Sequence, residues 1–108
     1  MAIADRDSPT DVASGGALDR DAAEALARTF RAVSDPTRLQ ILSFINGSAR
    51  GEAMVSEITA YLGLRQPTVS HHLKVMAEDG LLVRRQEGRT AWFSITPERR
   101  TAIADLLS

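Results

Sequence analysis

The stretch that most constrains the fold is residues 63–80, which read GLRQPTVSHHLKVMAEDG. Pro67 suits the first turn of a helix, because its φ is already helical and its missing N–H has no intrahelical partner there. Val69, Leu73 and Met76 then recur at the i, i+4, i+7 spacing that places apolar side chains on one helix face. A glycine at each end of the stretch is a typical helix stop. The pattern predicts the turn and second helix of a helix-turn-helix.

Capping residues and apolar periodicity predict further helices around this element. Ser34-Asp35-Pro36 is a strong helix start, and five apolar residues within 39–45 indicate the most buried helix of the fold. A loop is expected over 48–54, after which Ser56 would cap a short third helix whose buried side includes Tyr61. The helices are expected at 18–33, 36–45, 56–62, 67–79 and 97–107.

Beyond residue 80 the apolar period changes from that of a helix to that of a strand. Residues 81–86 and 90–95 flank Glu87-Gly88-Arg89, which is the pattern of a β-hairpin. Alternation along the second strand assigns the core face to Ala91, Phe93 and Ile95. The expected fold class is therefore mainly α with a small β-hairpin, in the order α-α-α-α-β-β-α, which is a winged helix-turn-helix.

Length and composition limit the class of protein. A chain of 108 residues with no cysteine forms one small domain that has neither disulfides nor thiolate metal sites. Residues 1–17 are polar and aperiodic, which predicts a disordered tail before a single domain over 18–108. There is no apolar run of membrane-spanning length and no secretory signal pattern, so we expect a cytoplasmic protein with no membrane partner.

Charge is divided unevenly along the chain. Residues 1–24 hold six acids and two bases, a net of −4, whereas residues 25–108 hold eight acids and eleven bases, a net of +3. Five of these bases lie on the proposed helix-turn-helix and on the hairpin after it: Arg65, Lys74, Arg84, Arg85 and Arg89. A modest, localised basic surface suits a dimer that doubles its phosphate contacts, although surface arginines are common and charge alone does not decide the function.

Three segments carry a likeness to known proteins: SDPTRLQIL at 34–42, QPTVSHHLK at 66–74, and GLLV at 80–83 followed by EGR at 87–89. In this order and spacing they resemble the ArsR/SmtB family of bacterial transcriptional repressors, over roughly residues 20–107. The resemblance implies a homodimer, formed through the first and last helices, that binds an imperfect inverted repeat in double-stranded DNA.

The resemblance also implies which side chains of the helix-turn-helix reach DNA. The family positions that match Gln66, Ser70 and His71 face the major groove. Helix geometry adds Thr68 and Lys74, because both lie opposite the apolar face. The alternative is an exposed helix surface with no partner.

On the hairpin, Arg89 resembles the wing arginine of the family, which reaches phosphate or the minor groove. Arg84 and Arg85 must lie on opposite faces of a regular strand, so only one of them can point to DNA, and Arg84 is the one we expect. His72 falls nearer the apolar face of its helix, and we interpret it as a partly buried structural residue.

Two apolar stripes are candidates for the dimer interface, one on the first helix and one on the last. A monomer of this size need not bury both, and two-fold readers of DNA place paired helices about one DNA turn apart. The alternative is that both stripes pack into the core of their own chain. The expected interface residues are Leu18, Ala22, Leu26, Phe30, Ile103, Leu106 and Leu107.

The chain departs from the family at its metal site. Thiolate sensors of the family carry Glu-Leu-Cys-Val-Cys-Asp-Leu at the start of the third helix, where this sequence has Glu-Ala-Met-Val-Ser-Glu-Ile over 52–58. Met54 and Ser56 cannot replace two thiolates, because both charge and affinity come from S⁻. The last helix has no histidine for the second site of the family, and His71 and His72 diverge by about 100° around their helix. We therefore expect no metal and no cofactor, and the effector is left open.

The leading function is a sequence-specific transcriptional regulator, most simply a repressor. One alternative is a winged-helix module that binds protein, which an apolar rather than polar face over 66–74 would favour. Another is a metal- or metalloid-responsive repressor with an unrecognised site. An enzyme finds no support, because the sequence has no clustered acids, phosphate loop or His–carboxylate spacing that indicates catalysis.

Overall fold

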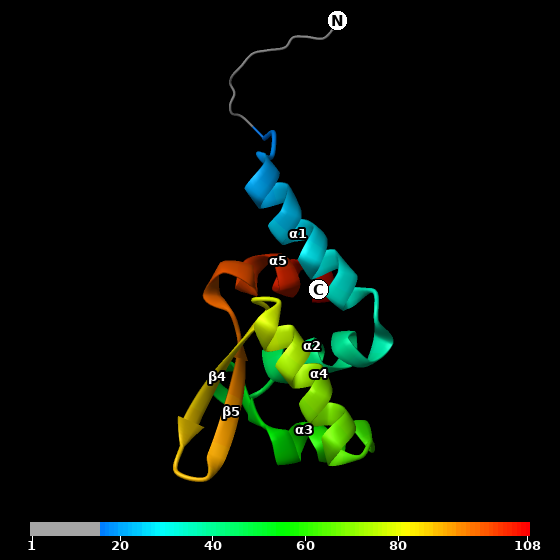
Figure 1. Ribbon diagram of the computed structural model, residues 1–108, viewed down its shortest axis with the longest axis vertical. Helices are drawn as coiled ribbons and strands as arrows, with labels where there is room; N and C mark the ends of the chain where they lie inside the picture. The colour runs from blue at the N-terminus through cyan, green and yellow to red at the C-terminus, as the bar shows by residue number, and fades with distance from the viewer. Residues whose placement is uncertain (1–15) are drawn as a thin grey trace, which may run out of the picture.

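The computed structural model describes residues 16–108 and contains the elements of a winged helix-turn-helix in the expected order (Figure 1). The helices are α1 (Arg20–Val33), α2 (Pro36–Asn46), α3 (Val55–Leu62), α4 (Gln66–Glu78) and α5 (Pro97–Leu107), and the hairpin strands are β4 (Leu82–Glu87) and β5 (Thr90–Ile95). This confirms the predicted fold class. The predicted tail over 1–17 lies outside the described residues, apart from its last two. Within residues 16–108, no helix combines the length and apolarity needed to cross a bilayer.

A third strand was not predicted. The segment 48–54, expected to be a loop, forms a 3-10 turn over Ala49–Gly51 and then strand β3 (Glu52–Met54). β3 pairs antiparallel with β5, so the sheet has three strands in the order β3-β5-β4. Three residues are too few to show the alternation that identifies a strand in a sequence. The hairpin is therefore attached to the segment that leads directly into α3.

The helix starts agree with the sequence at α2 and differ at α3. Asp35 caps α2, since its carboxylate accepts hydrogen bonds from the N–H groups of Thr37 at 2.9 Å and Arg38 at 3.2 Å. Ser56 does not cap α3, which corrects the expectation. The helix begins one residue earlier, and the Glu57 carboxylate accepts a hydrogen bond from the N–H of Met54 at 2.9 Å. Ser56 instead lies exposed in the first turn.

The core lies between the helices and the inner face of the sheet. As expected for the most buried helix, α2 contributes three fully buried side chains, and α4 and β5 contribute the apolar faces that the sequence indicated. These residues are Ile41, Leu42, Ile45, Val69, Leu73, Met76, Phe93 and Ile95. Tyr61 is a correction, because its side chain is 53% exposed and its ring stacks on Phe44 with 4.7 Å between centroids.

Candidate nucleic-acid interface

Helix α4 has two faces with opposite chemistry. Val69, Leu73 and Met76 hold one face against the core. Because these three residues occupy the inner face, the polar side chains between them are turned to solvent. Of the seven residues expected to contact DNA, the five on α4 are all exposed: Gln66, Thr68, Ser70, His71 and Lys74. His72 is half-buried, as expected, and its Nδ1 is buried with no hydrogen-bond partner among the described residues.

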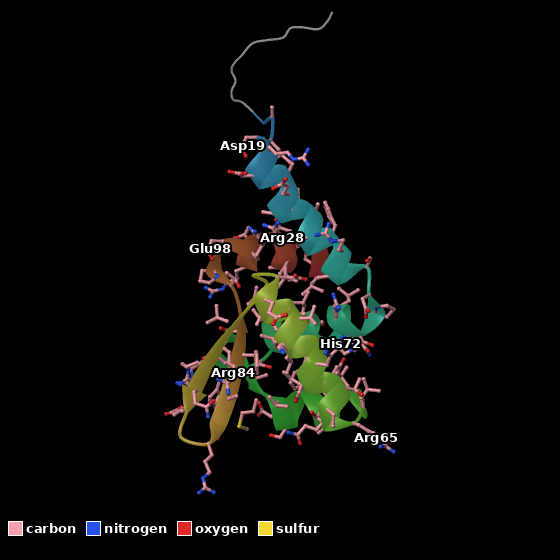
Figure 2. All side chains as sticks on the ribbon, viewed as in Figure 1. Asp19, Arg28, Arg65, His72, Arg84 and Glu98 are labelled. Atoms are coloured by element: carbon pink, nitrogen blue, oxygen red, sulfur yellow. The ribbon has the colours of Figure 1, made fainter. Side chains whose placement is uncertain are left out.

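The N-terminal end of α4 is open to a ligand. Gly63 ends α3 in the left-handed region, with φ 69°, which lets the chain turn sharply into the next helix. No side chain caps the first turn of α4, so its free N–H groups and partial positive charge face solvent. Arg65, the residue at the N-cap, is exposed beside this end (Figure 2). Arg65 belongs to the basic surface expected from the sequence but not to the expected DNA-binding set. Its position next to the turn is the signal that would have included it.

The hairpin carries one arginine at its tip and two along β4. Gly88, with φ 61°, allows the tight turn after which Arg89 stands exposed at the end of the hairpin. Arg84 is paired in register with Phe93, so its side chain lies on the sheet face that is turned to α4. It donates a hydrogen bond to Gln86. The alternation expected for Arg84 and Arg85 is therefore observed.

Arg85 lies on the opposite sheet face and is bound within the protein. Its guanidinium donates two hydrogen bonds to the carboxylate of Glu52 on β3, at 2.9 and 3.0 Å, and a third to Glu87 at 3.1 Å. It also lies 5.7 Å from the ring centroid of Trp92. The hydrogen bond from Arg85 holds the pKa of the Glu52 carboxyl below its ordinary value of 4.5, and Glu52 in turn raises the pKa of Arg85. Arg85 thus ties β4 across the sheet to β3.

The apolar stripes of α1 and α5 are only partly covered by the chain itself. Leu18, Phe30 and Leu106 are 58, 50 and 45% exposed. Leu18 precedes the first helix, which begins at Arg20. A hollow of about 250 Å³ between the two helices is lined by Leu18, Ala22, Leu26 and residues of α5.

Two members of the expected dimer set pack into their own chain. Ile103 is fully buried in the core, which corrects its assignment to an interface. Leu107 is half-buried against the same core. Helix α5 therefore divides its apolar residues, since Ile103 and Leu107 pack inward while Leu106 is exposed.

The segment that carries two cysteines in thiolate sensors carries a methionine and a serine in this chain. Met54 ends β3 and Ser56 lies in the first turn of α3. Across residues 16–108, no three His, Asp or Glu side chains gather closely enough to hold a metal ion. His71 and His72 have ring centroids 6.3 Å apart and interplanar angle 55°.

Comparison with known proteins identifies relatives of most of the chain. A family model described as bacterial regulatory protein, arsR family, matches residues 35–83. A protein of Streptomyces lividans named as a probable mercury resistance operon repressor is 38% identical over 84 residues, which cover 78% of this chain and 62% of that protein. The chain thus spans less than two thirds of the length of this relative. The HTH-type transcriptional regulator NmtR of Mycobacterium tuberculosis is 34% identical over 90 residues, covering 83% of this chain and 70% of the regulator.

Solved structures agree with the fold. A homodimeric winged helix-turn-helix DNA-binding domain from Mycobacterium bovis, determined by NMR, is 32% identical, with a TM-score of 0.66. The match covers 86% of this chain and 85% of that domain.

Proposed function

Since this chain belongs to the arsR family of bacterial regulatory proteins, we propose that it is a DNA-binding transcriptional repressor that acts as a homodimer on an inverted-repeat operator. The observation that carries the proposal is the exposed face of α4, where five polar or cationic side chains stand between the open helix end and the hairpin arginines. A helix of this kind enters the major groove while cations beside it bind phosphates. The same polar face argues against the alternative module that binds protein.

In this proposal the residues divide by role. Gln66, Ser70 and His71 contact base edges, and Thr68 supports them from the same face of α4. Phosphates are bound by the cations on or near that face: Arg65, Lys74, Arg84 and Arg89. Arg85 positions the hairpin through Glu52 and does not contact DNA.

The second part of the proposal is a homodimer formed through α1 and α5. The exposed side chains of Leu18, Phe30 and Leu106 support it, because a partner would remove their apolar surface from water. Ala22 and Leu26 line the hollow between the same helices. The homodimeric relative from Mycobacterium bovis also favours it.

The third part of the proposal concerns the signal that releases the repressor from DNA. We propose that release from DNA does not use the cysteine metal site of the family, because Met54 and Ser56 supply a thioether and a hydroxyl in place of two thiolates. A mercury-responsive mechanism, suggested by the name of the Streptomyces lividans relative, is the specific alternative.

Fluorescence anisotropy with DNA from upstream of the gene for this chain tests the proposal. We expect binding that a scrambled duplex cannot match, that weakens steeply with salt, and that does not change with Zn²⁺, arsenite or Hg²⁺. Gln66→Ala should lower the affinity for that DNA about tenfold or more, whereas Gln40→Ala, at an exposed glutamine of α2, should not. Equal binding to scrambled DNA would contradict sequence-specific repression at this site, and release by a metal ion would contradict the third part.

A further inference from the structure

An open groove of about 420 Å³ lies between α4 and the inner face of the hairpin. Its surface is apolar, with Leu73 and Ala77 from α4, Ala91 and Phe93 from β5, and Val55 at the start of α3. Leu73 and Phe93 also belong to the core, so this floor is held in place by the fold itself. A preformed apolar hollow of this volume, with a few polar groups at its edge, has the properties of a small-molecule site.

The rim of the groove has a definite charge pattern. Ser70, Lys74 and Glu78 follow one another at i, i+4 spacing along the exposed edge of α4, and Arg84 lies on the neighbouring strand (Figure 2). The rim therefore carries two cations, Lys74 and Arg84, and one carboxylate, that of Glu78. Among the ion pairs within residues 16–108, none involves Lys74 or Arg84. An anionic group at this rim would gain charge-assisted contacts with two cations that no carboxylate of residues 16–108 pairs with, since the hydrogen bond from Arg84 goes to the neutral side chain of Gln86.

We propose that this groove binds a small monocarboxylic acid with an apolar body, and that the bound acid competes with DNA. The apolar body covers the half-buried Val55, Ala77 and Ala91, beneath which Leu73 and Phe93 form the floor of the groove. The carboxylate accepts hydrogen bonds from Lys74 and Arg84. Glu78, further along the same edge, repels a second carboxylate and so selects monoacids over diacids.

The regulatory half of the inference rests on the proposed function, because Ser70, Lys74 and Arg84 serve both ligands. An acid that neutralises Lys74 and Arg84 withdraws two cations from the phosphates, and its body occupies the edge of α4 beside Ser70. The acid and the DNA must then weaken each other's binding by the same factor. A small monocarboxylic acid would then be the effector that releases this chain from DNA in place of a metal ion bound by cysteines.

NMR titration of the full chain, without DNA, tests the site itself. The probes are 4-phenylbutyrate and its neutral counterpart 4-phenylbutanol, added to millimolar concentration. We expect 4-phenylbutyrate to shift the resonances of Leu73, Ala77 and Phe93, and the alcohol to bind about tenfold more weakly because it lacks the charge. Lys74→Gln should remove most of that preference, whereas Arg31→Gln, at an exposed cation of α1, should leave it unchanged.

Filling the groove gives the second arm of the test. Ala77→Trp should abolish the shifts while the circular dichroism spectrum stays that of the parent, and Ala91→Leu replaces it if the first variant does not fold. The site is overturned if neither probe shifts the groove residues, if the shifts fall elsewhere, or if the alcohol binds as tightly as the acid. Anisotropy with DNA then tests the coupling separately: acid that binds without releasing DNA overturns competition only, and absent DNA binding contradicts the proposed function but not the site.

Discussion

The two ends of the domain differ in how far a single chain covers the apolar face of the helix at each end, α4 at one and α1 at the other. At the end formed by α3, α4 and the sheet, the apolar face of α4 is fully buried and its polar face is exposed. At the end formed by α1 and α5, Phe30 and Leu106 remain about half exposed, and the buried residues of α1 are only Thr29 and Ala32. The apolar face of α4 at the first end is thus complete within one chain, although Tyr61, Leu64 and Val83 stay exposed there, whereas the apolar face of α1 at the second end is suited to completion by another copy. The stability of the first end should therefore depend on packing within one chain, and that of the second end on contacts with another copy.

The largest effect is expected from Leu73→Ala, which opens a cavity in the complete end. Loss of a fully buried leucine should lower the free energy of unfolding by about 2–5 kcal/mol, because the surrounding core relaxes only partly. Urea denaturation followed by circular dichroism measures it. A loss well below 1 kcal/mol would mean that α4 is not held by the core as described.

The next effect concerns the incomplete end. Phe30→Asp should weaken dimerisation about a hundredfold or more, because a charge would replace half-exposed apolar surface in the proposed interface. Analytical ultracentrifugation should detect monomers whose helix content is unchanged. Leu64→Asp, at a leucine that is 41% exposed beside the turn before α4, is the matched control and should leave the dimer intact. Monomers in both variants, or in neither, would remove the proposed distinction between the ends.

A smaller effect is expected at the tip of the hairpin. Arg89→Ala should weaken DNA binding to all sequences alike and reduce the slope of log affinity against log salt by about one. Arg50→Ala, at another highly exposed arginine, should change neither quantity. If Arg89→Ala altered the preferred sequence instead, the hairpin would be reading bases in addition to binding phosphate.

The smallest effect is a pH dependence within the sheet. The folded-state pKa of Glu52 lies below its ordinary value, so the ion pair with Arg85 stabilises the fold above pH 4.5 and is lost as pH falls through the lowered pKa. The free energy of unfolding should therefore decline in that acidic range, and less steeply in Glu52→Gln. An identical acid profile for the two proteins would show that the Glu52–Arg85 pair does not contribute to stability.

Local patterns were sufficient to predict the helix-turn-helix. Val69, Leu73 and Met76 share one spacing on one helix, so their burial follows from the sequence alone. β3 could not be predicted in the same way, because three residues show no period. The contact of Glu52 with Arg85 could not be predicted either. The two residues are 33 positions apart in the sequence, and only the pairing of β3 with β5 brings them together.

The dimer stripe on α5 shows a different limit of sequence patterns. Periodicity marks Ile103, Leu106 and Leu107 as apolar, yet it cannot say whether the covering surface belongs to the same chain. The fold resolves this for Ile103, which is fully buried in its own core, and leaves Leu106 exposed. The DNA-contacting roles of Gln66, Ser70 and His71 stay predictions, supported by exposure on one face of α4.

The central place of β5 has a mechanical consequence. Because β5 is hydrogen-bonded to β3 on one side and to β4 on the other, the hairpin is joined through β3 to the first residue of α3 and through it to α4. This pairing should couple the angle of α4 to that of the hairpin. In a two-fold assembly, the distance between the two protomers should then vary more easily than the angle between α4 and the hairpin. Selection among operators by such a protein would fall on the spacer between half-sites more than on bending of the wing.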